Sequence, residues 1–163
     1  MATLKLAGVL LIISHSLFAR IGETLPECTR RYGKPSRAKD YEAERLGFSS
    51  EATSFTKDGI FVFISFFQGK ADRVAFVKDG GEFSEDELNT LLKANGGGLD
   101  WRPIGDPTDI YKFWRTFDGS RFASYRFDAL IIETATARAR ARAKEDAEEA
   151  KKKNESAKKM RGF

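Results

Sequence analysis

The chain has 163 residues, of which 41% are hydrophobic and 32% are charged, with 28 basic and 24 acidic side chains. This length fits one domain with short appendages, and the hydrophobic content excludes a wholly disordered chain. The single Cys excludes an intramolecular disulfide framework and a Cys-based zinc cluster.

Residues 1–19 have the layout of a secretory signal peptide. Lys5 precedes an apolar run over residues 6–13, and Ala19 is a small residue at the expected cleavage point. The run is shorter than the roughly 20 apolar residues that span a bilayer, which disfavours a membrane anchor. A buried first helix is the other alternative. We expect a periplasmic or secreted protein that begins near Arg20.

Export would remove several chemistries from the mature chain. His15 is the only His and would leave with the signal peptide. Catalytic triads, His-ligated metals and a His general base would then be excluded. Cys28 would enter an oxidising compartment, so we expect it to be buried rather than paired between chains. We expect no catalytic residue, no metal site and no cofactor.

The first predicted helix begins at a capping box over residues 24–27 and ends at Gly33-x-Pro35. Residues 60–67 and 70–77 then have the composition of two strands joined by a tight turn. Residues 39–56 are expected to contain another strand or two.

The second predicted helix begins at a capping box over residues 84–87 and ends at Asn95-Gly96. Strand-like segments over residues 110–117 and 121–127 follow, and Asp118-Gly119 between them is typical of a two-residue hairpin turn. The Gly-rich stretch after this helix is predicted to be a helix stop rather than a phosphate-binding loop. The helix dipole repels anions at that end, and no Gly-Lys-Ser/Thr follows.

A helix followed by an antiparallel meander therefore occurs twice, over about 20–80 and 81–134, with residues 129–134 as the final strand. Tight turns between consecutive strands require an antiparallel sheet. The predicted class is α+β, with one domain over residues 20–134 and a charged, Ala-rich C-terminal helix or disordered tail over 135–163.

Repeats that open with Gly22-x-Thr24 and stop the helix at Gly33-x-Pro35 resemble the SmpA/OmlA family of outer-membrane-assembly lipoproteins. They also resemble the wider group with the fold of the β-lactamase inhibitor protein. That family continues with a hairpin at a Gly-Lys turn, here Gly69-Lys70. The likeness covers roughly residues 21–77, with a fainter echo over 83–134, and this chain lacks the family's lipidated Cys. The resemblance implies this fold and a non-enzymatic role in the cell envelope, and it permits an inhibitor of a secreted enzyme.

A two-residue turn at Gln68-Gly69 would place apolar side chains on both faces of the first hairpin. One face would carry Ile60, Val62, Ile64, Phe66, Ala71, Ala75 and Val77, which suits contact with the helices. The other would carry Phe61, Phe63, Phe67, Val74 and Phe76. In the second hairpin, Phe113, Phe117 and Phe122 would share one face, with Trp114 and Tyr125 on the other.

An exposed aromatic face of this size would favour binding of a protein, a peptide or an apolar ligand. The candidate binding residues are Phe61, Phe63, Phe67, Phe76, Trp114, Arg115 and Tyr125. In the alternative, residues 39–56 or the other half of the domain cover the aromatic face as ordinary core.

The C-terminal segment from Thr134 onward carries ten basic and five acidic residues, whereas residues 20–133 carry 17 basic and 19 acidic ones. Strong helix formers and Glu–Lys pairs four residues apart favour a solvated single helix. The alternative is a contact with anionic lipid or an envelope polymer. No aromatic residue separates the bases, so nucleic acid is an improbable partner for an exported chain. The candidate contacts are Arg138, Arg140, Arg142, Lys151, Lys152 and Lys153.

The sequence therefore favours an exported, non-enzymatic binding or assembly protein of the bacterial cell envelope. The alternative is a secreted hydrolase that acts on envelope polysaccharide through a pair of carboxylates. The carboxylates available are Asp58, Asp72, Asp79 and Asp118. Three of the four lie near glycines or turns, where Asp is common for conformational reasons.

Overall fold

The computed structural model describes residues 20–37, 41–49, 51–106 and 111–160. The predicted signal peptide, with His15, lies outside the described residues. The elements are α1 (Leu25–Tyr32), β1 (Ser36–Arg37), α2 (Tyr41–Arg45), β2 (Thr53–Lys57), β3 (Ile60–Phe67), β4 (Lys70–Lys78), α3 (Glu85–Asn95), β5 (Trp101–Pro103), β6 (Tyr111–Thr116), β7 (Arg121–Arg126), β8 (Ala129–Thr134) and α4 (Ala135–Met160).

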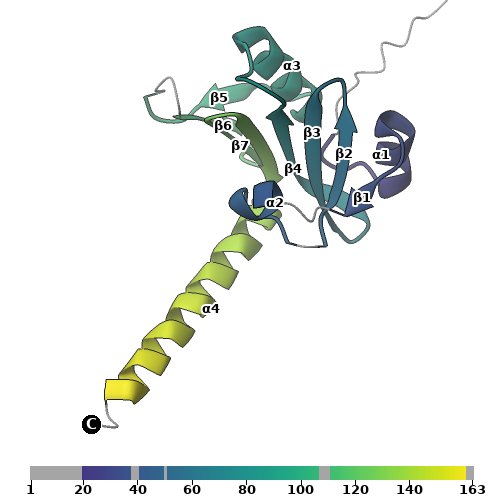
Figure 1. Ribbon diagram of the computed structural model, residues 1–163. Coiled ribbons are helices and arrows are strands. Elements are labelled where there is room, and N and C mark those ends of the chain that lie inside the picture. The colour runs from purple at the N-terminus through teal and green to yellow at the C-terminus, as the bar shows by residue number, and fades with distance from the viewer. Residues whose placement is uncertain (1–19, 38–40, 50, 107–110, 161–163) are drawn as a thin grey trace, which may run out of the picture.

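The strands form one antiparallel sheet in the order β1-β2-β3-β4-β8-β7-β6-β5 (Figure 1). The first four strands occur in chain order from one edge to the centre, and the last four repeat that order from the other edge. Two helix-plus-meander units therefore meet at the β4–β8 pair. The predicted α+β class and the predicted duplication are confirmed.

Local sequence accounts for the starts of α1 and α3. The backbone N–H of Ser84 donates to Glu87 Oε2 at 2.7 Å, and the N–H of Glu87 donates back to Ser84 Oγ at 3.3 Å. At α1, the N–H and hydroxyl of Thr24 both donate to Glu27 Oε2 at 2.7 Å. These bonds satisfy N–H groups that have no partner inside the helix, and they place a carboxylate at its positive end.

Helices α1 and α3 cover the same side of the sheet, which we call the helix face. Cys28 is fully buried there, as predicted, and burial raises the pKa of its thiol to about 12. The core on this face also contains Leu88, Leu91 and Leu92 from α3, and Val62, Ile64, Val74, Phe76, Leu130 and Ile132 from the strands.

The predicted pairing of the first hairpin is correct next to the turn and wrong beyond it. Phe66 lies opposite Ala71, as expected, but Ser65 then lies opposite Arg73, so that Asp72 is an extra residue in β4. Side chains alternate along a strand, so this bulge moves every later residue of β4 to the other face. Val74 and Phe76 therefore lie on the helix face, whereas Ala75 and Val77 lie on the opposite side, which we call the outer face.

The outer face of the first unit is covered. Phe63 is 2% exposed and packs against Phe48, with 6.3 Å between the ring centroids. The cover comes from α2 and the residues after it, including Ala43, Leu46 and Ala52. Residues 39–56 were expected to hold a strand or two. Within their described part, they supply one helix and most of β2.

The C-terminal segment is a helix that leaves the sheet and projects away from it (Figure 1). Only its first turns contact the domain, where Ala137 is 7% exposed. No helix in the described part of the chain is both long enough and apolar enough to cross a lipid bilayer.

Candidate functional site

The structure does not bring the seven predicted binding residues together. Phe76, Phe63 and Tyr125 are 0%, 2% and 3% exposed, so they belong to the core. The Tyr125 hydroxyl also accepts a hydrogen bond from the N–H of Phe83 at 3.2 Å. The bulge explains Phe76, because it turns that ring away from Phe63 and into the main core.

The other four predicted residues are divided between the two faces. Trp114 lies on the helix face and is partly buried against the main core. Phe61 and Phe67 are 38% and 41% exposed and lie on the outer face of the first unit. Arg115 lies on the outer face of the second unit. The grouping predicted for the second hairpin is correct, since Phe113 and Phe122 share a face opposite to that of Trp114 and Tyr125.

The outer face of the second unit carries an aromatic and arginine-rich surface that no described helix covers. Strand register builds it, because Phe113 lies opposite Ser124 and Arg115 lies opposite both Phe122 and Arg102. Phe113 is 46% exposed. We call this surface the aromatic–arginine face and define it by Arg102, Phe113, Arg115, Phe122, Ser124, Arg126 and Ile131.

The arginines of this face are available to an acidic ligand. Arg102 stacks over Phe117, with its Cζ 4.0 Å from the ring centroid, and Phe117 itself is 67% exposed. Arg115 and Arg126 form no ion pair with an acidic side chain in the described part of the chain. Arginine beside an exposed aromatic ring offers an acidic group a planar donor and an apolar platform together.

Helix α4 borders one side of this face. Arg138 stacks over Phe122, with its Cζ 4.3 Å from the ring centroid. A hollow of about 340 Å³ lies between α4 and β6–β7, and its lining includes Arg115, Phe122, Arg138 and Arg142. The lining therefore combines an aromatic ring with three cations.

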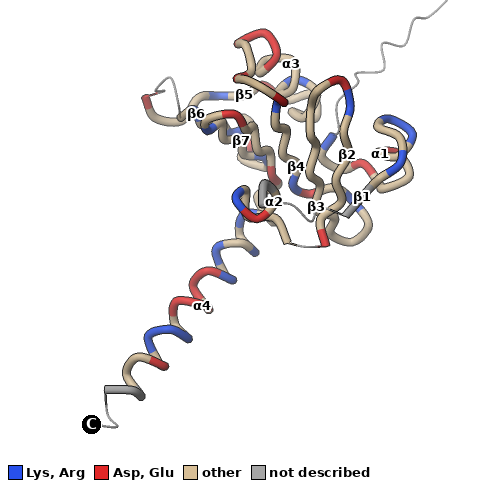
Figure 2. Tube along the Cα trace, in the orientation of Figure 1, with Lys and Arg blue, Asp and Glu red and all other residues tan. Residues whose placement is uncertain are grey.

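Two of the predicted anionic-surface residues are engaged within the protein. Arg140 forms an ion pair with Asp72 and stacks over Phe67 at 3.8 Å, and Arg138 lies 4.0 Å from Glu133. By contrast, Lys151, Lys152 and Lys153 are exposed on the projecting part of α4. Figure 2 shows that part as alternating acidic and basic blocks.

The bulge and the root of α4 share a buried charge cluster. Glu133 lies 3.6 Å from Arg73, and burial raises the pKa of Glu133 in spite of this cation. Arg73 also donates to the carbonyls of Gly47 at 2.7 Å and Leu46 at 2.9 Å, and it stacks over Phe48. This arginine therefore clamps the cover of the first unit onto the sheet.

Two of the carboxylates considered for hydrolysis are committed to local contacts. Asp72 is bound to Arg140. Asp118 accepts hydrogen bonds from the hydroxyl of Thr116 at 2.7 Å and the N–H of Ser120 at 3.0 Å, which lower its pKa. Asp58 has a φ of +51° in the turn between β2 and β3. Among the described residues, no group of three His, Cys, Asp or Glu side chains is placed to hold a metal ion.

Comparison with known proteins identified no relative: no protein family, no curated protein and no solved structure matches this chain.

Proposed function

We propose that the chain is an exported, non-enzymatic binding protein of the cell envelope. Its aromatic–arginine face docks an acidic segment of a partner protein that also carries apolar or aromatic side chains. Helix α4 extends toward an anionic surface through Lys151, Lys152 and Lys153.

One observation carries the proposal: the outer face is covered in the first unit and uncovered in the second, within one sheet. Exposed Phe113 and Phe117 offer apolar area, and Arg102, Arg115 and Arg126 offer charge that no acidic side chain of the described residues pairs with. Aromatic residues and arginine are the residue types that dominate binding energy at protein interfaces. Single-stranded nucleic acid could meet the same groups, and the predicted signal peptide is what favours a protein partner.

The first test uses polymers of defined chemistry. A random Glu–Tyr copolymer should bind the protein more tightly than poly-Glu, and a Lys–Tyr copolymer should not bind. Replacing Arg115 and Arg126 with Gln should weaken Glu–Tyr binding on the order of tenfold, since each lost charge-assisted contact costs about 1 kcal/mol or more. Replacing Lys151 and Lys152 with Gln is the matched control and should change it less.

The second test is made in native cells. A photo-crosslinking amino acid at Phe113 should capture one protein through an acidic segment, and the Arg115→Gln/Arg126→Gln variant should lose that product. The same group at Asp86, which is exposed on α3, is the control position. Capture of RNA, of a second copy of this chain, or of the same product from Asp86 would contradict the proposal.

The compartment has its own measurement. Intact mass and amino-terminal sequencing of the protein from fractionated cells should show a chain that begins near Arg20 outside the cytoplasm. A cytoplasmic chain that keeps residues 1–19 would contradict export and make nucleic acid the leading ligand for both basic surfaces.

A further inference from the structure

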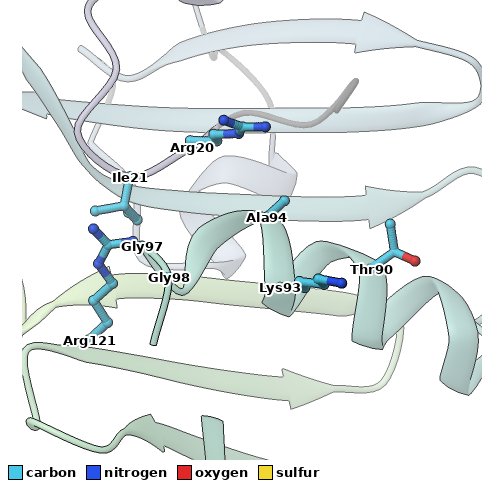
Figure 3. Close-up of a pocket in the computed structure, with 8 residues that line it drawn as sticks. All are labelled: Arg20, Ile21, Thr90, Lys93, Ala94, Gly97, Gly98 and Arg121. Atoms are coloured by element: carbon cyan, nitrogen blue, oxygen red, sulfur yellow. The ribbon is translucent and has the colours of Figure 1, made fainter. Parts of the chain in front are cut away.

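A separate hollow of about 640 Å³ lies where α3 ends beside the start of the described chain (Figure 3). Its lining includes Arg20, Lys93 and Arg121, together with Gly97 and Gly98. The described residues that line it include no Asp or Glu. Three positive side chains from segments far apart in sequence therefore line one hollow, with Arg121 turned toward Ile21 and Gly97 and Lys93 pointing along α3 toward Thr90 (Figure 3).

Arg121 is held in a fixed position there. Its Nη1 donates to the backbone carbonyl of Asn95, and the guanidinium packs against Gly97. A Cβ on residue 97 would come within 2.6 Å of Arg121 Nη2, and the φ of +67° at Gly97 also disfavours other residues. The remaining N–H groups of the guanidinium make no hydrogen bond within the described chain. A pre-organised planar donor of this kind suits phosphate oxygens.

Buried Asn95 connects the three segments. Its side-chain oxygen accepts the N–H of Ile21 at 3.0 Å, and its amide donates to the carbonyl of Leu91 at 3.0 Å. Asn95 is fully buried, so the segment around Ile21 and the end of α3 are fixed relative to Arg121. Burial lowers the pKa of Arg121 from its ordinary value, and Asp118 opposes that change.

The C-terminus of a helix carries a partial negative charge, which disfavours a bound anion. Two hydrogen bonds and the nearby cations offset this effect here. Trp101 Nε1 donates to the carbonyl of Leu92 at 2.7 Å, and Arg121 takes the carbonyl of Asn95. Two of the last four carbonyls of α3, which would repel an anion, are thus occupied by donors. The roughly half charge of a helix end is also smaller than the charge of Lys93 and Arg121 together.

We propose that this hollow binds a phosphate group with two or more negative charges. Arg121 is the bidentate donor, and Lys93 supplies a second charge. Three cations without an acidic residue in the described lining favour a phosphate with two or more charges over a singly charged carboxylate. The site is on the helix face, so it does not depend on the proposed docking of a partner at the aromatic–arginine face.

The test measures binding of inorganic pyrophosphate by calorimetry on the full chain, with acetate as the contrasting anion. We expect saturable binding at one site per chain, weakened about tenfold or more by Arg121→Gln. Lys93→Gln should weaken it about twofold to fivefold, and because Lys93 is exposed, this variant tests the site even if Arg121→Gln destabilises the fold.

The matched control is Arg30→Gln, which removes one positive charge, as each site variant does, from an exposed residue away from the hollow. Vesicles of phosphatidylglycerol and phosphatidylcholine distinguish a lipid headgroup from a soluble phosphate. Vesicle binding that needs Arg121 and Lys93 supports a headgroup as the natural source. The proposal is overturned if pyrophosphate and vesicles both fail to bind, if acetate binds equally, or if the control variant loses as much binding as the site variants.

Discussion

The two units of this protein share one plan and differ in a single connection. In the first, residues 38–52 join β1 to β2 and contain α2, which packs on the outer face. In the second, the shorter residues 104–110 join β5 to β6, and no described helix lies on the corresponding face. In the first unit, therefore, both faces of the sheet are covered. In the second unit, only the helix face is covered by a described helix.

This difference shows how a duplicated fold can separate stability from recognition. The helix faces of both units contribute to one shared core, so either unit could leave its outer face bare without losing that core. The second unit, whose outer face no described helix covers, exposes Phe113 and Arg115, whereas the covered unit buries Phe63. Substitutions at matching places should therefore have opposite consequences in the two units.

The largest expected effect is that of Phe63→Ser compared with Phe113→Ser. Phe63 is 2% exposed, so its replacement should lower the free energy of unfolding by about 4 kcal/mol, as for other buried Phe truncations. Phe113 is 46% exposed, and its replacement should change the free energy of unfolding by less than about 1 kcal/mol. Urea unfolding followed by circular dichroism measures both.

Equal losses for the two variants would mean that the second unit is covered in solution, by a second copy or by a part of the chain that the structure does not describe. A concentration-dependent midpoint would identify a second copy, since association couples stability to protein concentration.

Arg73→Met should have the next largest effect, because Arg73 clamps the cover of the first unit and faces Glu133. We expect a loss of about 2 kcal/mol at neutral pH, less than for a fully buried ion pair, because both side chains are partly exposed and Arg138 also lies near Glu133. Equilibrium unfolding at neutral pH measures this loss, and Lys57→Met on β2 is a control that removes a cation elsewhere.

The loss of stability caused by Arg73→Met should depend on pH. Burial raises the pKa of Glu133, so the folded state holds its proton more tightly than the unfolded chain does. This contribution to stability is present below the ordinary carboxyl pKa and is lost as the pH rises through the folded-state value. Without Arg73 that pKa rises further, so the loss should extend toward neutral pH. Adding Glu133→Gln should remove this dependence; if it persists, another group causes it.

The first turns of helix α4 contact both units, and two of its arginines allow a finer comparison. Arg140 contacts Asp72 and Phe67 of the first unit, whereas Arg138 contacts Phe122 and Glu133 of the second. Arg140→Met leaves the Asp72 carboxylate without its cation, and Asp72 Oδ1 already has no hydrogen-bond partner among the residues that the structure describes. We expect a loss of about 1–2 kcal/mol in the free energy of unfolding.

Arg138→Met should cost less than about 1 kcal/mol, because its ion pair is long and half-exposed. Deleting residues 146–163 should cost less still, since that part of α4 is exposed along its described length. Thermal unfolding of the three variants would test the order, and a large loss from the deletion would show that the projecting helix packs against something.

Much of this fold could be predicted from local sequence patterns. The predictions that were wrong or missing have physical causes. Capping boxes and tight turns depend on a few neighbouring residues, so α1, α3 and the hairpins follow from the sequence. The bulge at Asp72 does not, because the residue is held by Arg140 from the far end of the chain. Strand β5 is short and was not predicted. Helix α2 derives its position from burying Leu46 and Phe48 against Phe63, which no local period reveals.

The candidate site was less predictable, because it also depends on packing between segments that are far apart in the sequence. Phe113 and Phe122 were correctly placed on one side of the second hairpin, and Arg115 was among the candidate binding residues. Whether that side is open depends on the length of a connection and on what packs there. The hollow at Arg121 joins residues about a hundred positions apart, and the glycines beside it gave only the signal of a helix stop.

Small effects are also expected at the two capping boxes, where the units are most alike. Ser84 exchanges two hydrogen bonds with Glu87, so Ser84→Ala should cost about 1 kcal/mol in the free energy of unfolding. Thr24→Ala removes a hydroxyl that donates to Glu27 and leaves the backbone bond to that carboxylate in place, so it should cost about half as much.

Acid titration sharpens this last comparison. Backbone N–H donors lower the pKa of both Glu27 and Glu87, so each carboxylate stabilises the fold above its unfolded-state pKa, and that stabilisation is lost as the pH falls through the folded value. Glu87 also accepts hydrogen bonds from Lys78 at 2.9 Å. The free energy of unfolding should therefore fall less steeply with decreasing pH in Glu87→Gln than in Glu27→Gln. If the two variants reduce the acid dependence equally, Lys78 does not contribute to the cap.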